Sequence, residues 1–174
     1  MLGRYDFFPD IYHGRMNIEY DLDKRTLQTA IIKVLLKLNN EEVESSEITG
    51  LENEDLHVYF EFGFAEGRTF TFIDEEEAAF ILREIRENPF DLMDVFCALK
   101  YYRVIDGRLR PLKFDYNMIR FKFEDGSLSV LFFHERGPRR IEFSLLMKFI
   151  LKRMHSLLGE KHRKELKTIS LFEV

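Results

Sequence analysis

Short turns that contain glycine, flanked by residues of alternating polarity, restrict the fold of this chain more than any other feature of its sequence. The clearest turn is Asp125-Gly126, which favours a two-residue hairpin between strands at about 116–123 and 127–134. Because side chains alternate along a strand, pairing across this turn predicts one apolar face. That face would hold the pairs Phe123 with Leu128, Phe121 with Val130 and Ile119 with Phe132.

Two further turns predict hairpins earlier in the chain. A turn at His13-Gly14 would pair Ile11 with Met16, Pro9 with Ile18 and Phe7 with Tyr20. Pro9 has no backbone donor, which favours a strand at a sheet edge. A three-residue loop at 65–67, with Gly67 in the left-handed region, keeps the phenylalanines on one face by pairing Phe64 with Arg68, Phe62 with Phe70 and Phe60 with Phe72.

The hairpins are followed by segments with helical periodicity. A helix capped by Asp21 or Asp23 would bury Leu27, Ile31, Val34, Leu35 and Leu38. A capping box of Asp74 and Glu77 would precede a helix with Ala78, Ile81, Leu82 and Ile85 on its inner side. Asn88-Pro89 would start another helix through Leu92, Phe96, Leu99 and Tyr102. The remaining expected elements are a strand at 139–143, a helix at 143–158 and a basic helical tail at 161–167.

These elements predict a single α+β domain over residues 1–174, in which three ββα-like units of antiparallel hairpins pack against about five helices. The pattern leaves the number of sheets open. The order of curved hairpins followed by packing helices resembles, at the level of the fold, single-strand-binding proteins such as the Whirly family. The chain shares no motif with that family, so the resemblance assigns no site residue.

The two halves of the chain carry opposite charge. Residues 1–97 hold 9 Lys and Arg against 22 Asp and Glu, a net charge of −13. Residues 98–174 hold 17 against 9, a net charge of +8. This asymmetry predicts an acidic face and a basic face, which either neutralise each other within the fold or meet an anionic partner outside it.

Composition excludes several classes of protein. The single cysteine, Cys97, allows neither an internal disulfide nor a thiolate zinc cluster. No apolar run approaches the roughly 20 residues that cross a bilayer, and the acidic, aromatic N-terminus is unlike a secretion signal. These features predict a cytoplasmic protein with no membrane contact. The lack of Trp, the single Gln and the abundant Lys, Arg and Glu are typical of a thermophile.

The basic half predicts the leading function. The second face of the Asp125-Gly126 hairpin combines cations with Met118, Leu131 and an aromatic ring. Cations neutralise phosphates and exposed rings stack on unpaired bases, which together predict binding of single-stranded DNA or RNA. The predicted site residues are Arg120, Lys122, Phe133, Arg136, Arg139 and Arg140. The alternative is that helices also cover this face, in which case Leu131 and Phe133 belong to the core.

A second hypothesis is a homo-oligomeric assembly or adaptor, in which the acidic and basic halves of neighbouring copies meet. The expected helix at 143–158 has an additional apolar edge of Leu145, Phe149 and Met154, which is either buried within the domain or a homodimer seam. Residues 168–172 resemble the short Leu-Phe peptide that docks bacterial replication proteins into the sliding clamp, without its leading Gln. The other interpretation of 168–172 is a terminal strand or helix end packed against the core.

No catalytic motif stands out. The histidines at 13, 57, 134, 155 and 162 lack the spacing of metal ligands, although His134-Glu135-Arg136 could support acid–base chemistry. Cys97 lies in an apolar segment, which indicates a buried and unreactive thiol. There is no glycine-rich phosphate loop. We therefore predict that the chain is not an enzyme and holds no metal or cofactor.

Overall fold

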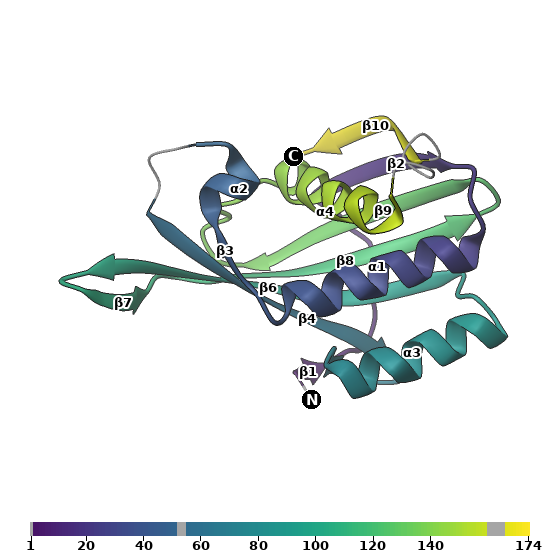
Figure 1. Ribbon diagram of the computed structural model, residues 1–174, viewed down its shortest axis with the longest axis horizontal. Helices are drawn as coiled ribbons and strands as arrows, with labels where there is room; N and C mark the ends of the chain where they lie inside the picture. The colour runs from purple at the N-terminus through teal and green to yellow at the C-terminus, as the bar shows by residue number, and fades with distance from the viewer. Residues whose placement is uncertain (1, 52–54, 160–165) are drawn as a thin grey trace.

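All strands of the described chain belong to one antiparallel sheet (Figure 1). The computed structural model describes residues 2–51, 55–159 and 166–174. The sheet order is β1-β5-β4-β6-β8-β9-β2-β10, with β3 paired to β4 and β7 paired to β6. The strands are β1 (Gly3–Arg4), β2 (Gly14–Tyr20), β3 (Glu42–Glu44), β4 (Leu56–Glu66), β5 (Thr69–Phe72), β6 (Leu92–Ile105), β7 (Arg108–Pro111), β8 (Asp115–Glu124), β9 (Ser127–Arg136) and β10 (Leu166–Glu173). The helices are α1 (Lys24–Leu38), α2 (Ser45–Thr49), α3 (Glu75–Glu87) and α4 (Phe143–Leu158).

The three long helices lie on one face of the sheet (Figure 1). Helix α1 contacts both α3 and α4, so the helices form a continuous layer. We call the opposite face the back face. Residues 5–13, here called the N-terminal segment, cross the back face, and Figure 1 shows their purple trace passing behind the strands.

The core lies between the sheet and the helices, and β6 shows how the sequence places it there. Alternate residues of β6 face the helices and are buried: Met93, Val95, Cys97, Leu99 and Tyr101. Between them, Asp94, Phe96, Lys100 and Tyr102 point to the back face and are partly exposed. A strand covered on both faces carries apolar residues in both sets, which removes the simple alternation of a half-exposed strand.

Several predicted elements are confirmed. The Asp125-Gly126 turn joins β8 to β9 with the predicted pairs, from Phe123 with Leu128 to Ile119 with Phe132. Asp74 caps α3 by accepting the N–H of Glu77 at 2.8 Å, and α3 buries Ala78, Ile81 and Ile85. Helix α1 buries the predicted Leu27, Ile31, Val34, Leu35 and Leu38.

The predicted hairpin at His13-Gly14 is wrong. Strand β2 pairs with β9 and β10 instead, and residues 5–13 form no strand. Phe8 is buried on the back face, with the guanidinium of Arg120 4.8 Å from its ring centre. The apolar side chains of this segment therefore cover a sheet face rather than extend the sheet.

The predicted register of the second hairpin is also wrong. Glu66 pairs with Thr69 and Ala65 pairs with Phe70, which leaves Gly67 and Arg68 as a two-residue turn. Phe70 is then buried on the back face, where its ring centre lies 4.9 Å from that of Tyr5. The prediction assumed that only one face of the hairpin is covered, whereas the N-terminal residues also cover the other face.

The predicted helix through Leu92, Phe96, Leu99 and Tyr102 is strand β6, and the predicted strand at 139–143 is a loop before α4. The described chain therefore has four helices, and it does not repeat a ββα unit three times. Strand β6 has apolar residues on both faces, so some of them also fall at helical spacing. Most of the predicted helical tail lies outside the described residues, and its last two residues, Leu166 and Lys167, begin β10.

The two segments expected to contact partners, the helix at 143–158 and residues 168–172, differ in their exposure. Phe149 and Met154 of α4 are buried, and Phe149 stacks on Phe60 with a 6.0 Å centroid distance. The extra apolar edge of α4 is therefore part of the core rather than a dimer seam. Residues 168–172 lie within the terminal strand β10, paired to β2, but they are exposed rather than packed against the core. Within the described residues, no helix is both long and apolar enough to cross a membrane.

A pair of glutamates makes the stability of the fold depend on pH. Burial, followed by the neighbouring Glu66 carboxylate, raises the pKa of Glu77 to about 8 from an ordinary value of 4.5. The protonated carboxyl is therefore favoured in the folded chain. Its contribution to the free energy of unfolding is complete below about pH 4.5 and is lost as the pH rises through about 8.

We predict that Glu77→Gln removes this loss, because an amide stays neutral at every pH. The melting temperature at about pH 9 should be a few degrees higher for the variant than for the wild type, with little difference at about pH 5. Thermal melts followed by circular dichroism measure this. Glu75→Gln, at an exposed site in the same helical turn, is the control. A difference that is the same at both pH values would contradict the assignment.

Candidate nucleic-acid interface

Arg120 lies on the back face of β8, but internal groups bind its charge. Its Nε and Nη2 atoms donate to Oδ1 and Oδ2 of Asp94 at 2.8 and 2.9 Å. The Tyr5 hydroxyl donates to the same carboxylate, and burial and Asp94 raise the pKa of Tyr5 to about 12. Arg120 therefore attaches the N-terminal segment to the sheet, and Asp94 already supplies the negative charge that a phosphate would provide.

The N-terminal segment also reaches Phe133. The rings of His13 and Phe133 stack with a 5.1 Å centroid distance, and His13 Nδ1 accepts the N–H of His134 at 2.9 Å. Burial, with the charge of Arg139, lowers the pKa of His13, which suits its role as an acceptor. Phe133 is thus partly covered by this segment rather than by a helix. Lys122 stays exposed, with its Nζ atom 3.9 Å from Glu124.

A buried carboxylate positions the loop that carries the other predicted arginines. Asp115 is 1% exposed and accepts the Tyr101 hydroxyl at 2.5 Å. It also accepts the backbone N–H groups of Arg139 and Arg140 at 2.6 and 2.9 Å. Arg139 has a φ of 56°, a conformation that few non-glycine residues adopt. Asp115 therefore holds the loop after β9 in a shape that its sequence alone would not favour.

The arginine that ends β9 and the two arginines of this loop have different surroundings. Arg139 donates to the carbonyl of Val174 at 2.6 Å and lies 3.6 Å from Glu173. Arg140 is exposed, with its guanidinium 5.8 Å from the centre of the Tyr101 ring. Arg136 is exposed and lies 4.3 Å from the centre of the Tyr116 ring. Among the described residues, no carboxylate lies within 4.0 Å of the Arg136 or Arg140 side chain.

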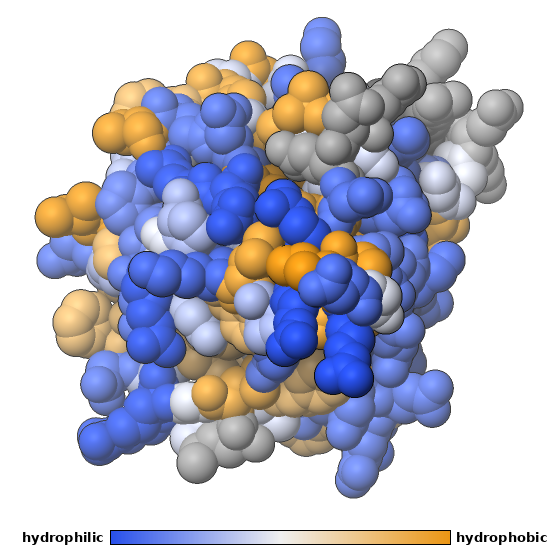
Figure 2. Space-filling view, turned by 90° about the vertical axis from the view of Figure 1, so that its left-hand side faces the viewer, coloured by the Kyte–Doolittle hydropathy of each residue, from blue (hydrophilic) through white to orange (hydrophobic). Residues whose placement is uncertain are grey.

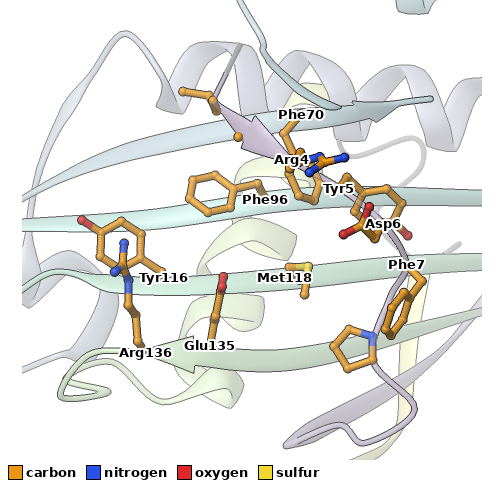
Figure 3. A pocket seen from close by; sticks show the side chains of 13 residues that line it. Arg4, Tyr5, Asp6, Phe7, Phe70, Phe96, Tyr116, Met118, Glu135 and Arg136 are labelled. Atoms are coloured by element: carbon orange, nitrogen blue, oxygen red, sulfur yellow. The ribbon is translucent and has the colours of Figure 1, made fainter. Parts of the chain in front are cut away.

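Beside Arg136, the back face is open and hollowed. A pocket of about 460 Å³ lies between residues 2–9 and strands β5, β6, β8 and β9 (Figure 3). Phe96 and Tyr116 line it with a 6.2 Å centroid distance, and both are partly exposed. Figure 3 shows the Arg136 guanidinium against the Tyr116 ring and Arg4 on the other side of the pocket. The pocket is therefore an aromatic surface with a cation at each end.

A second hollow of about 550 Å³ continues this surface past Arg136, because Tyr116 and Arg136 line both. Lys113 and Phe114 line its far side. The ring of Phe114 lies 5.7 Å from that of Tyr102, which lies 5.3 Å from that of Tyr59. These partly exposed rings form what we call the aromatic row: Phe96, Tyr116, Phe114, Tyr102 and Tyr59.

The charges along the aromatic row are mixed. Arg4, Lys113 and Arg136 are exposed, and no described carboxylate lies within 4.0 Å of their charged groups. Asp6 and Glu135 line the first pocket and are exposed as well. Lys100 is paired with Glu61. The row thus has three available cations, spaced along its length rather than gathered at one point.

Most of the aromatic row lies outside the site predicted from the sequence. Phe96 and Tyr102 belong to the segment with helical spacing, and Tyr116 stands at the start of an expected strand without a predicted site role. Of the predicted site, Arg136 alone lines both hollows. One sequence signal could have identified the row: an aromatic residue between two residues that belong to the core, as in Val95-Phe96-Cys97. In a strand, such an aromatic side chain points to the face opposite the core.

The described residues offer little to nucleophilic or metal chemistry. Cys97 is fully buried, and burial raises the pKa of its thiol far above the usual range. No group of three or more His, Cys, Asp or Glu side chains in the described chain could hold a metal ion. His134 is bound on both sides, with Nδ1 2.8 Å from Asn117 Oδ1 and Nε2 3.0 Å from the carbonyl of Gly137. It therefore supports the loop at 136–140.

Comparisons of the chain with protein-family models, with curated proteins and with solved structures found no match.

We predict that Asp115→Asn lowers the free energy of unfolding by about 2 to 3 kcal/mol, because a buried amide cannot accept all three of the hydrogen bonds that the carboxylate accepts. Urea denaturation measures the change. Tyr101→Phe removes one of these bonds and leaves the carboxylate paired with the two backbone groups, so it should cost only about 1 kcal/mol. Equal losses in the two variants would show that Asp115 does not organise the loop.

Proposed function

We propose that this chain binds single-stranded nucleic acid along the aromatic row. The observation that carries the proposal is the row itself: five partly exposed rings on and beside the face that the helices leave free. Rings held by strands lose little entropy when a ligand binds, because the sheet already fixes their positions. Unpaired bases stack on such rings whatever their identity, since every base has a flat π face.

The cations beside the row suit a phosphate backbone. Arg4, Lys113 and Arg136 lie along the line of rings, so a strand stacked on the row would pass each of them. Phosphate contacts need accessible cations and no fixed angle, which spaced side chains provide. The contact of Arg136 with Tyr116 also presents a flat guanidinium, on which a base can stack.

The proposed site differs from the one predicted from the sequence, because the N-terminal segment partly covers Arg120 and Phe133.

We predict that Tyr116→Leu weakens binding of a fluorescent oligonucleotide about tenfold, because one stacking surface is lost. Arg136→Ala should weaken binding too, and should reduce the slope of log affinity against log salt by about one. Fluorescence anisotropy at several salt concentrations measures both effects, for DNA and for RNA.

Lys148→Ala is the matched control, because Lys148 is an exposed cation on α4 and its loss changes the net charge equally. Its affinity should stay close to that of the wild type. Absence of binding at low salt would refute the proposal. Equal weakening by Lys148→Ala and Arg136→Ala would show that net charge, rather than the aromatic row, attracts the strand.

We propose self-association through β10 as a second candidate function. Strand β10 ends the sheet, and Ile169 and Phe172 on it are 54% and 52% exposed. The opposite end of the sheet is β1, which has only two residues. A long apolar edge strand can pair with the same strand of a second copy.

We predict that Ile169→Lys lowers the oligomeric state measured by light scattering during gel filtration, because a charge on an edge strand opposes pairing. Association through β10 should persist at high salt, whereas an assembly of acidic and basic halves should dissociate as screening rises. A chain that is monomeric without any substitution would refute this candidate.

A further inference from the structure

The hairpin of β6 and β7 extends beyond the body of the sheet (Figure 1). We call residues 103–110 of this hairpin the arm, and all of them are exposed. Figure 2 looks onto this end of the molecule and shows apolar surface bordered by strongly hydrophilic surface. The apolar part of the arm consists of Val104, Ile105 and Leu109, which are between 45% and 49% exposed.

The arm gathers arginines on one of its faces. The register places Arg103 opposite Arg110 and Ile105 opposite Arg108, so the three arginines share a face, while Val104 and Leu109 occupy the other. No carboxylate of the described chain lies within 4.0 Å of these arginines. Asp106 is the only acidic residue within the arm itself.

This arrangement does not stabilise the hairpin. Like charges that lie directly opposite each other across two strands are destabilising, and Arg103 and Arg110 are such a pair. The arm has no core beneath it to offset that cost, because its side chains are exposed on both faces. An anionic partner held between the guanidinium groups would turn the repulsion into attraction.

The composition of the arm indicates which kind of polyanion it suits. Residues 103–113 contain no aromatic ring, so the arm cannot stack on unpaired bases as the aromatic row can. A two-stranded ribbon fits the major groove of a duplex, where arginine binds both phosphates and the edge of guanine. The arm therefore has the chemistry of a duplex-binding element, whereas the row has that of a single-strand-binding element.

The two surfaces meet at the base of the arm. Tyr102, a member of the aromatic row, pairs with Pro111 there, and the next pair along the hairpin is Arg103 with Arg110. Because side chains alternate along a strand, these arginines lie on the opposite side of the ribbon from Tyr102, so a nucleic acid that leaves the row reaches them around the edge of the arm. We infer that the arm binds the double-stranded flank of a nucleic acid whose unpaired strand lies on the aromatic row, so that the preferred ligand is a junction between single and double strands. This inference rests on the proposed function for the unpaired part.

The test compares three fluorescent probes: a single strand of about 15 nucleotides, a blunt duplex, and a duplex carrying that single strand as an overhang. The arm variant replaces Arg103, Arg108 and Arg110 by Ala. The control variant replaces Arg83, Lys148 and Lys152 by Ala, which removes the same charge from exposed positions on α3 and α4. Circular dichroism confirms that each variant is folded.

The wild type should bind the overhang probe about tenfold or more tightly than the single strand. The arm variant should lose this gain, and its salt slope on the overhang probe should fall by about two to three, while its affinity for the single strand stays within about twofold. The control variant should keep the gain.

Three outcomes would overturn the inference: no gain from the flank in the wild type, equal loss in the arm and control variants, or equal weakening of the single strand and the overhang probe in the arm variant. Failure of the proposed function is a separate result, because it would appear as single-strand binding that is absent or unaffected by Tyr116→Leu.

Discussion

The sheet has apolar side chains on both faces, but the helices cover only one of them, so part of the back face stays open (Figure 1). The N-terminal segment covers part of the back face through contacts of Tyr5, Phe8 and His13. The part that stays open lies between that segment and the arm, and the aromatic row occupies it. Apolar surface that remains on a folded chain is a common mark of a binding site. Here the open surface arises because a large sheet meets a helical layer on one side only.

A single buried carboxylate connects the core with the open surface. Asp115 begins β8, accepts the hydroxyl of Tyr101 from the core side, and accepts two backbone N–H groups from the loop after β9. That loop also contains Gly137, one residue after Arg136, the cation shared by both hollows. Burial raises the pKa of Tyr101 well above its usual range, as does the carboxylate, so the hydroxyl remains a donor. A buried carboxylate thus positions the loop, together with the contacts of His134 and Arg139.

Some local signals in the sequence predicted local structure correctly, whereas the turn signals at His13-Gly14 and 65–67 did not. The Asp125-Gly126 turn determines its own register, and the Asp74 cap depends on residues three apart. Predictions that needed knowledge of the second face failed: β6 showed helical spacing because both of its sides are apolar, and the second hairpin changed register because Phe70 is buried on the back face. Arg120 was predicted to be a site residue because of its charge. Its partner, Asp94, lies on a neighbouring strand 26 residues away, and no local sequence pattern reveals that pairing.

The tight fit around Gly137 has an evolutionary consequence. Its φ is 114°, and a Cβ atom there would lie 2.2 Å from the carbonyl oxygen of Phe114 and 2.5 Å from a carboxylate oxygen of Asp115. No other amino acid fits this position without a shift of the backbone at Phe114 and Asp115. We therefore expect proteins that share this fold by common descent to retain Gly137 together with Asp115. The exposed arm has no such steric limit, so only a binding role would retain its arginines. A glycine and an aspartate separated by twenty-two positions would therefore mark kinship longer than the arginines do.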